Sequence, residues 1–219
     1  MNESRVPAAL FDAIKRDLRP VRPLASPARR ALALLPVGII LLIGMPAFWA
    51  WRSHLSPLTT WPSWGLSALE TALSLVILAA AFREAIPGRE LSTRMLVVLM
   101  SLACGIFFAF NETLQLTEPV PIQTVARWMW DCVTMATAFS IPALAVPMWL
   151  MSHALPNRPA LTGALGGLGV GLMADAGLRL LCWNGTHAHV LLAHGGAIAT
   201  LMALGALSAT LLERSKERR

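Results

Sequence analysis

Long apolar runs alternate with short polar segments along most of this chain. Six of these runs, at about 20 residues each, are long enough to cross the roughly 30 Å hydrocarbon core of a bilayer as helices. They cover residues 31–51, 64–82, 95–114, 132–151, 160–182 and 190–212. Because lipid offers no partner for backbone N–H and C=O groups, each run must fold as an α-helix. The pattern therefore predicts an all-α bundle of six membrane-spanning helices.

The polar ends of the chain suggest three parts. Residues 1–30 form a polar, proline-containing head, residues 31–212 the six-helix bundle, and residues 213–219 a basic tail. No small-residue cleavage site follows the first apolar run, so we interpret this run as a first span and not as a secretory signal peptide. The composition agrees, since 56% of residues are hydrophobic and only 14% are charged, whereas soluble domains carry about 25% charged residues.

The distribution of basic residues predicts the orientation of the bundle. Of the 18 Lys and Arg residues, all but Arg52, Arg127 and Arg179 lie in the head, the tail, or the loops after the second and fourth runs. Such an excess marks the cytoplasmic side of a membrane protein. We therefore expect both termini in the cytoplasm. The net charge of +6 reflects this bias, and without an aromatic-interleaved basic patch we expect no direct contact with nucleic acid.

The head contains a second apolar pattern. Leu10, Phe11, Ile14 and Leu18 recur at helical spacing, and the intervening positions are polar or charged. This predicts a short amphipathic helix, which is marginally stable alone in water. Its apolar stripe needs cover from membrane lipid, from another part of the chain or from a protein partner. With lipid as the cover, the helix would only fix topology.

Two cysteines fall at the same predicted depth. Cys132 opens the fourth span and Cys182 closes the fifth, so both lie at the outward membrane edge on helices that are neighbours in sequence. Their Cα atoms can therefore approach the roughly 5.5 Å that a disulfide needs. Three interpretations stay open: a structural disulfide, a redox or metal sensor, or two unrelated buried thiols.

Histidines close to the second cysteine add a metal hypothesis. His187 and His189 follow Cys182 by five and seven residues, and His194 lies further into the sixth span. Thiolates together with imidazoles suit zinc or a softer metal such as cadmium. The alternative is that both loop histidines are simply solvated.

Charged residues inside the spans form a third candidate site. Asp175 and Arg179 lie four residues apart on the fifth span, so an intrahelical ion pair is available. Glu70 lies inside the second span and is a further candidate partner for Arg179. Buried charges in a membrane often mark proton or ligand sites, but they also occur as satisfied packing contacts.

We find no catalytic signature in the sequence. Ser-His-Asp order, a phosphate-binding loop and an HExxH motif are all missing. A thiol–quinone oxidoreductase would normally carry a reactive CxxC pair, which this chain lacks. We therefore expect a protein that is not an enzyme and has no resident cofactor, apart from transient zinc or heavy-metal binding at the outer cysteines.

Two segments carry a family resemblance. Residues 18–30 (LRPVRPLASPARR) form a proline-rich connector that leads directly into the first span. Residues 155–161 (LPNRPAL) stand between Cys132 and a Gly/Ala-rich fifth span that ends at Cys182. Together with the six-span plan, these features resemble the NrsF family of bacterial membrane anti-sigma factors.

The resemblance implies a function and a site for it. Members of the family hold an extracytoplasmic-function sigma factor at the inner membrane through the cytoplasmic N-terminal segment. Here that segment is the head around Leu10, Phe11, Ile14 and Leu18. The resemblance further implies that Cys132 and Cys182 sense an oxidant or a thiol-reactive metal.

A different function class also fits the residues. In this alternative the chain is a small transporter or channel, with Glu70, Asp175 and Arg179 as an intramembrane polar site.

Overall fold

The computed structural model describes residues 8–17, 23–50, 61–117, 125–182 and 186–218. All regular elements in these ranges are helices, so the prediction of an all-α chain is confirmed. Within the same ranges, six helices are long and apolar enough to cross a membrane: Pro27–Phe48, Trp64–Glu84, Thr93–Glu112, Cys132–Ser152, Pro159–Arg179 and His187–Lys216. These lie within a few residues of the apolar runs, apart from longer ends on the first and last spans.

Two of the spans are interrupted helices. The first consists of α2 (Pro27–Leu32), α3 (Leu35–Ile39), the π-helical turn η1 (Ile40–Gly44) and α4 (Met45–Ala50). The sixth consists of α9 (His187–His189), a second π-helical turn η3 (Val190–Gly195) and α10 (Gly196–Glu217). The other four are α5 (Trp61–Glu84), α6 (Thr93–Thr117), α7 (Val125–Ser152) and α8 (Pro159–Arg179).

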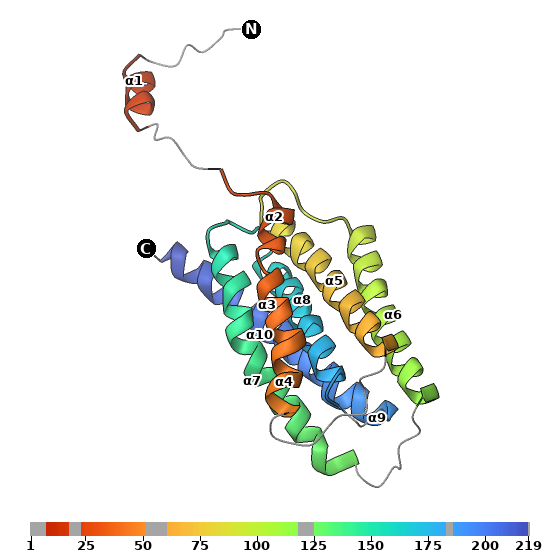
Figure 1. Ribbon diagram of the computed structural model, residues 1–219. Coiled ribbons are helices and arrows are strands. Elements are labelled where there is room, and N and C mark those ends of the chain that lie inside the picture. Colours follow the sequence, from red (N-terminus) through yellow and green to blue (C-terminus); the bar gives the residue numbers. More distant parts are fainter. Residues whose placement is uncertain (1–7, 18–22, 51–60, 118–124, 183–185, 219) are drawn as a thin grey trace.

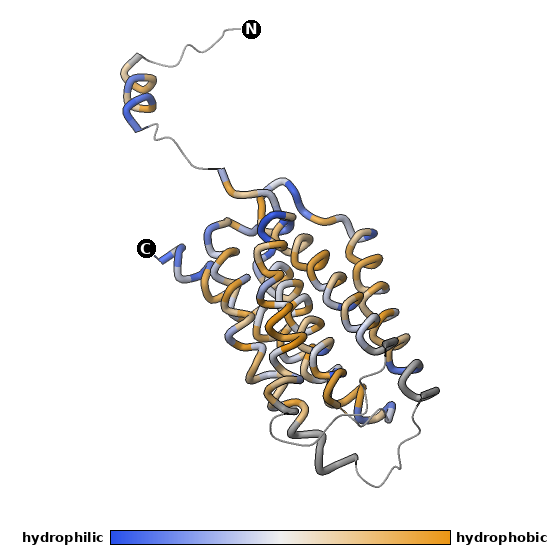
Figure 2. The backbone as a smooth tube through the Cα atoms, viewed as in Figure 1, coloured by the Kyte–Doolittle hydropathy of each residue, from blue (hydrophilic) through white to orange (hydrophobic). Residues whose placement is uncertain are grey.

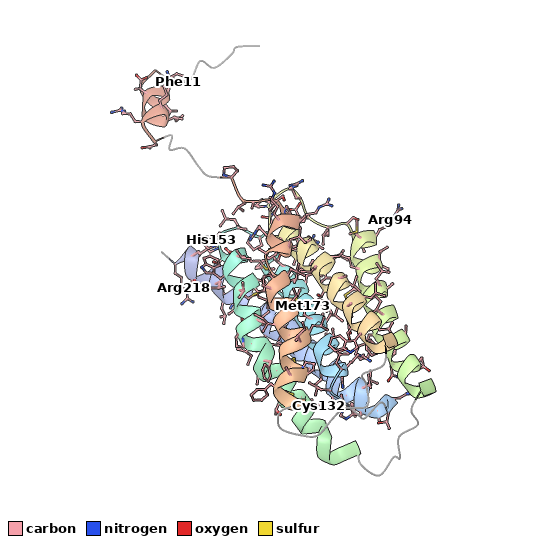
Figure 3. The ribbon with its side chains drawn as sticks, in the orientation of Figure 1. Phe11, Arg94, Cys132, His153, Met173 and Arg218 are labelled. Carbon is pink, nitrogen blue, oxygen red and sulfur yellow. The ribbon has the colours of Figure 1, made fainter. Side chains whose placement is uncertain are left out.

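The six spans lie side by side in one bundle with two chemically different ends (Figure 1). One end, here called the basic end, carries Arg30, Arg83, Arg94 and Arg158. The opposite end, here called the cysteine end, carries Cys132 and Cys182. Figure 2 shows hydrophobic residues along the helices and hydrophilic residues around the basic end. Figure 3 labels Arg94, His153 and Arg218 at the basic end and Cys132 at the other.

Helix α8 is the centre of the bundle. It packs against α5, α7, α10 and η1, and nearly all of its residues are buried. Its contact with α10 is very close because both helices carry glycine where they meet. A Cβ atom on Gly163 would overlap the carbonyl group of Gly205, and one on Gly167 would overlap that of Leu201. Small residues allow this approach between membrane helices.

Ion pairs tie the loops of the basic end together. Buried Glu84 accepts hydrogen bonds from Nε of Arg158 at 2.6 Å and from the backbone N–H of Leu91 at 2.7 Å. Glu90 accepts a hydrogen bond from the Asn157 amide at 2.7 Å. Together with backbone hydrogen bonds of Glu90 itself and of Gly88, this bond lowers the pKa of the Glu90 carboxyl. The loop after α5 is thus fixed to the loop between α7 and α8.

The head contains one described helix, α1 (Ala8–Asp17), which Figure 1 draws apart from the bundle. Leu10, Phe11 and Ile14 on this helix are each about half exposed. Leu18, the fourth member of the predicted stripe, lies outside the described residues, as do residues 19–22 of the connector. The division of the chain at residues 30 and 212 stays a prediction.

Candidate functional site at the cysteine end

The two cysteines of the fourth and fifth spans meet at this end. Cys132 lies in the second turn of α7, and Cys182 follows α8 after a short turn. Their Sγ atoms are 3.7 Å apart and are not joined in a disulfide. Cys182 is buried and Cys132 is partly buried. The sequence-based expectation that these residues are neighbours in space therefore agrees with the structure, although their role is a separate question.

Two buried histidines complete a compact group with the cysteines. His189 Nε2 lies 3.2 Å from Cys182 Sγ, and the ring of His194 lies beside that of His189 with centroids 5.5 Å apart. The ligand atoms of Cys132, Cys182, His189 and His194 all lie within 4.8 Å of one another. We call these four residues the Cys–His cluster. It joins α7, the segment after α8, and the start of the sixth span.

The π-helical turn η3 explains why both histidines face the cluster. Residues five apart on an α-helix differ in direction by about 140°, because each residue turns by about 100°. His189 immediately precedes η3, and His194 lies within it, five residues further along the chain. The wider i→i+5 turn of a π-helix brings such a pair toward one side, and π-turns are frequent at functional sites. In the sequence, the only indication of this arrangement is the five-residue spacing of the two histidines, which would not place them on one face of an α-helix.

His187, a predicted metal ligand, lies outside the cluster. Its ring contacts the Asn111 amide at 3.4 Å and the Glu112 carboxylate at 3.2 Å. Its side chain is 61% exposed. His194, which is not among the predicted ligands, lies in the cluster instead. His187 stands before η3, on the part of the segment that faces α6.

A chain of buried polar groups connects the cluster to α8 and α5. His194 Nδ1 lies 2.6 Å from Asp175 Oδ1. The other carboxylate oxygen of Asp175 accepts a hydrogen bond from Arg179 Nε at 2.7 Å, which is the intrahelical pair expected from the sequence. Arg179 Nε also lies 3.9 Å from Glu70 Oε2 on α5. The three groups of the predicted intramembrane polar site are therefore neighbours.

Arg179 is enclosed on all sides. Its guanidinium lies 4.6 Å from the ring centroids of both Phe107 and Phe110 on α6. It also donates to the Phe107 carbonyl at 3.3 Å. Cation–π contacts are strongest for desolvated cations, so the two rings, the Phe107 carbonyl and the bonded Asp175 carboxylate offset the cost of burying this charge. This arrangement is typical of a fixed structural charge that orients its neighbours.

The donor set determines which chemistry the cluster supports. Two thiols and two imidazoles can bind a soft or borderline metal ion, and two thiols at contact distance can be oxidised to a disulfide after a small approach. Asp175 contacts the cluster through His194, and Arg179 and Glu70 follow Asp175 in the chain of polar contacts. Their arrangement favours positioning of that histidine.

Comparison with known proteins gives one match. The family model of NrsF, described as "Negative regulator of sigma F", matches residues 15–214. No curated protein and no solved structure matches the chain. The matched range covers nearly the whole chain, including all six apolar helices and the Cys–His cluster. The chain thus belongs to the NrsF family of negative regulators of sigma F.

Proposed function

We propose that this protein is an inner-membrane anti-sigma factor that sequesters an extracytoplasmic-function sigma factor through its N-terminal segment. It is a regulator and not an enzyme. The family supports negative regulation of a sigma factor. The observation that carries the choice of binding segment is the exposed apolar surface of α1. Leu10, Phe11 and Ile14 are half exposed on a short helix drawn apart from the bundle, and such a surface fits a groove in a partner.

The charge distribution supports the orientation that this proposal needs. A sigma factor is a cytoplasmic protein, so α1 and the basic end belong on the cytoplasmic side. The positive-inside rule gives the same orientation. It places the Cys–His cluster at the outward face, where the compartment outside a bacterial inner membrane is oxidising. Lipid covers the exposed apolar faces of the outer helices.

The cysteine pair is our proposed sensor. Oxidation by a peroxide would join the two Sγ atoms in a disulfide. The two thiols would give up two electrons and two protons, and the peroxide would be reduced to two waters. A thiol-reactive metal would instead bind both sulfurs as thiolates. Either event pulls α7 toward the end of α8, and α8 connects to the basic end through Arg158.

A pull-down of the sigma factor by the full-length protein tests the binding segment. Phe11→Asp places a charge in the apolar stripe and should abolish capture. Ala9→Asp places the same charge on the opposite face of α1 and should leave capture intact. If Phe11→Asp captures the sigma factor normally, α1 is not the docking helix.

A second comparison tests the sensor. The double variant Cys132→Ser/Cys182→Ser should capture the sigma factor but fail to release it after treatment with peroxide or cadmium. Cys104→Ser, which removes the remaining cysteine, should release it like the parent protein. Release from the double variant would contradict the sensor assignment.

The intramembrane polar groups fit this function as positioning residues. Arg179 is bonded to Asp175 and enclosed by Phe107 and Phe110, so little of its charge is available to a substrate. We therefore prefer the anti-sigma function to a transporter or channel.

A further inference from the structure

We propose that Cys132, Cys182, His189 and His194 form a four-coordinate binding site for a divalent metal ion of the zinc and cadmium class. The site includes two histidines that the cysteine-pair sensor does not require. Its existence depends only on the geometry of the cluster, whereas any link between metal occupancy and sigma-factor release rests on the proposed function.

The distances within the cluster match tetrahedral zinc coordination. Two thiolates that each lie about 2.3 Å from Zn²⁺ at the tetrahedral angle are about 3.8 Å apart. The Sγ atoms of Cys132 and Cys182 are 3.7 Å apart. A thiolate and an imidazole nitrogen on the same ion are about 3.6 Å apart, and Cys182 Sγ lies 3.2 Å from His189 Nε2. These two distances lie within a few tenths of an ångström of the zinc values. All four ligand atoms lie within 4.8 Å of one another, so the more widely spaced pairs must approach further to complete a ligand shell.

A second observation points to the same site. His194 Nε2 is buried and has no hydrogen-bond partner among the described residues. Its Nδ1 faces the Asp175 carboxylate at 2.6 Å. Metal-binding histidines typically donate one ring N–H to a carboxylate and present the other nitrogen to the metal. The contact with Asp175 thus leaves Nε2 as the nitrogen of His194 that can bind an ion in the cluster.

Charge and burial favour a borderline or soft divalent ion. Two thiolates neutralise a 2+ ion, and two neutral imidazoles complete the shell, so the occupied site carries no net charge. This matters because His189, His194 and Cys182 are all buried, and an uncompensated charge there would be costly. Mg²⁺ and Ca²⁺ prefer oxygen ligands, which this cluster lacks.

Zinc titration and X-ray absorption of the full-length protein test the proposal. The protein is purified in detergent micelles, reduced, stripped with chelator and titrated with Zn²⁺ against a chromophoric competitor. We expect one zinc per chain. The absorption fine structure of the unmodified protein should show two sulfur ligands at about 2.3 Å and two nitrogen ligands at about 2.0–2.1 Å. Failure of the folded protein to bind zinc, or a shell without nitrogen, would overturn the site.

Histidine variants identify the nitrogen ligands. His189→Ala and His194→Ala should each weaken zinc binding by at least about tenfold. His187→Ala is the matched control and should bind zinc like the parent, because its ring faces Asn111 and Glu112. Equal affinities in all three variants would exclude histidine ligation. Elution in size-exclusion chromatography shows whether each variant folds. If a variant does not fold, the X-ray absorption fine structure of the unmodified protein determines whether nitrogen ligands are present.

The two proposals fail separately. Zinc binding with the expected shell but no capture of a sigma factor would remove the proposed function and leave the metal site. Capture without zinc binding would remove the metal site and leave the proposed function.

Discussion

His194 Nδ1 on the sixth span lies 2.6 Å from Asp175 Oδ1 on the fifth, and both side chains are buried. This contact fixes the direction of the imidazole ring, because the Nδ1–H donates to a carboxylate that Arg179 holds from its other side. Nε2 is consequently directed away from Asp175. An acidic residue inside a membrane helix is thereby explained as a positioning group for one ligand of the Cys–His cluster.

Asp175→Asn tests this positioning role. The amide oxygen is a weaker acceptor for the Nδ1–H and lacks the negative charge that raises the basicity of the ring. Loss of such outer partners typically reduces metal affinity by about 10- to 100-fold, and we expect a zinc affinity lower by that factor. Glu84→Gln is the control, because Glu84 is a buried carboxylate at the basic end, where it accepts hydrogen bonds from Arg158 and Leu91. Equal zinc affinities of the parent and Asp175→Asn would show that Asp175 does not position His194.

Gly167→Ala should weaken the contact between α8 and α10. The new methyl group would overlap the carbonyl group of Leu201. Overpacking of this kind costs about 1–3 kcal/mol of stability. The measurement is the apparent melting temperature in detergent. Gly105→Ala on α6 is the matched control: nothing lies within 4 Å of its Cβ position, and alanine favours a helix. We expect that variant to melt at the parent temperature or slightly above, and equal melting of both variants would contradict the close approach.

Arg158→Ala should destabilise the basic end. Glu84 is fully buried and would lose its hydrogen bond to the Arg158 guanidinium. A buried acceptor left without its partner costs about 1–3 kcal/mol of stability. We expect a loss near the lower end of this range, because the Arg158 side chain is 42% exposed. Arg158→Lys should restore part of the melting temperature. A lysine supplies the positive charge but lacks the several N–H donors of the planar guanidinium. Arg83→Ala, whose hydrogen bond to the Arg89 carbonyl is exposed, should change it little. A parent-like melting temperature for Arg158→Ala would argue against this bond as a stabilising contact.

Much of the fold could be predicted from the sequence because lipid permits so few solutions. Apolar runs of about 20 residues must be helices, and this alone gave the six spans. The proximity of Cys132 and Cys182 followed from their equal depth on consecutive spans. The Asp175–Arg179 pair followed from a spacing of four residues on a helix.

The composition of the Cys–His cluster could not be predicted in the same way. His194 lies within an apolar run, and an α-helix would point it away from His189. The π-helical turn that brings the two rings together has no signature in the local sequence. His187 was named with His189 as a possible ligand, but its ring is directed to α6. Likewise, the Gly/Ala-rich composition of the fifth span does not identify Gly205 as the residue that Gly163 meets.

The central position of α8 has a consequence for how the protein is made. Of the six apolar helices it has the lowest mean hydropathy, and it carries Asp175 and Arg179, which are among the least favourable residues for insertion at the centre of a membrane. Glu70 on α5, and Phe107 and Phe110 on α6, are synthesised before Arg179, so partners for its charge are already available when it arrives. His194 arrives later, with the sixth span. We therefore expect α8 to enter the membrane during biogenesis by joining helices that are already there, so the core of the bundle is assembled from its periphery inward.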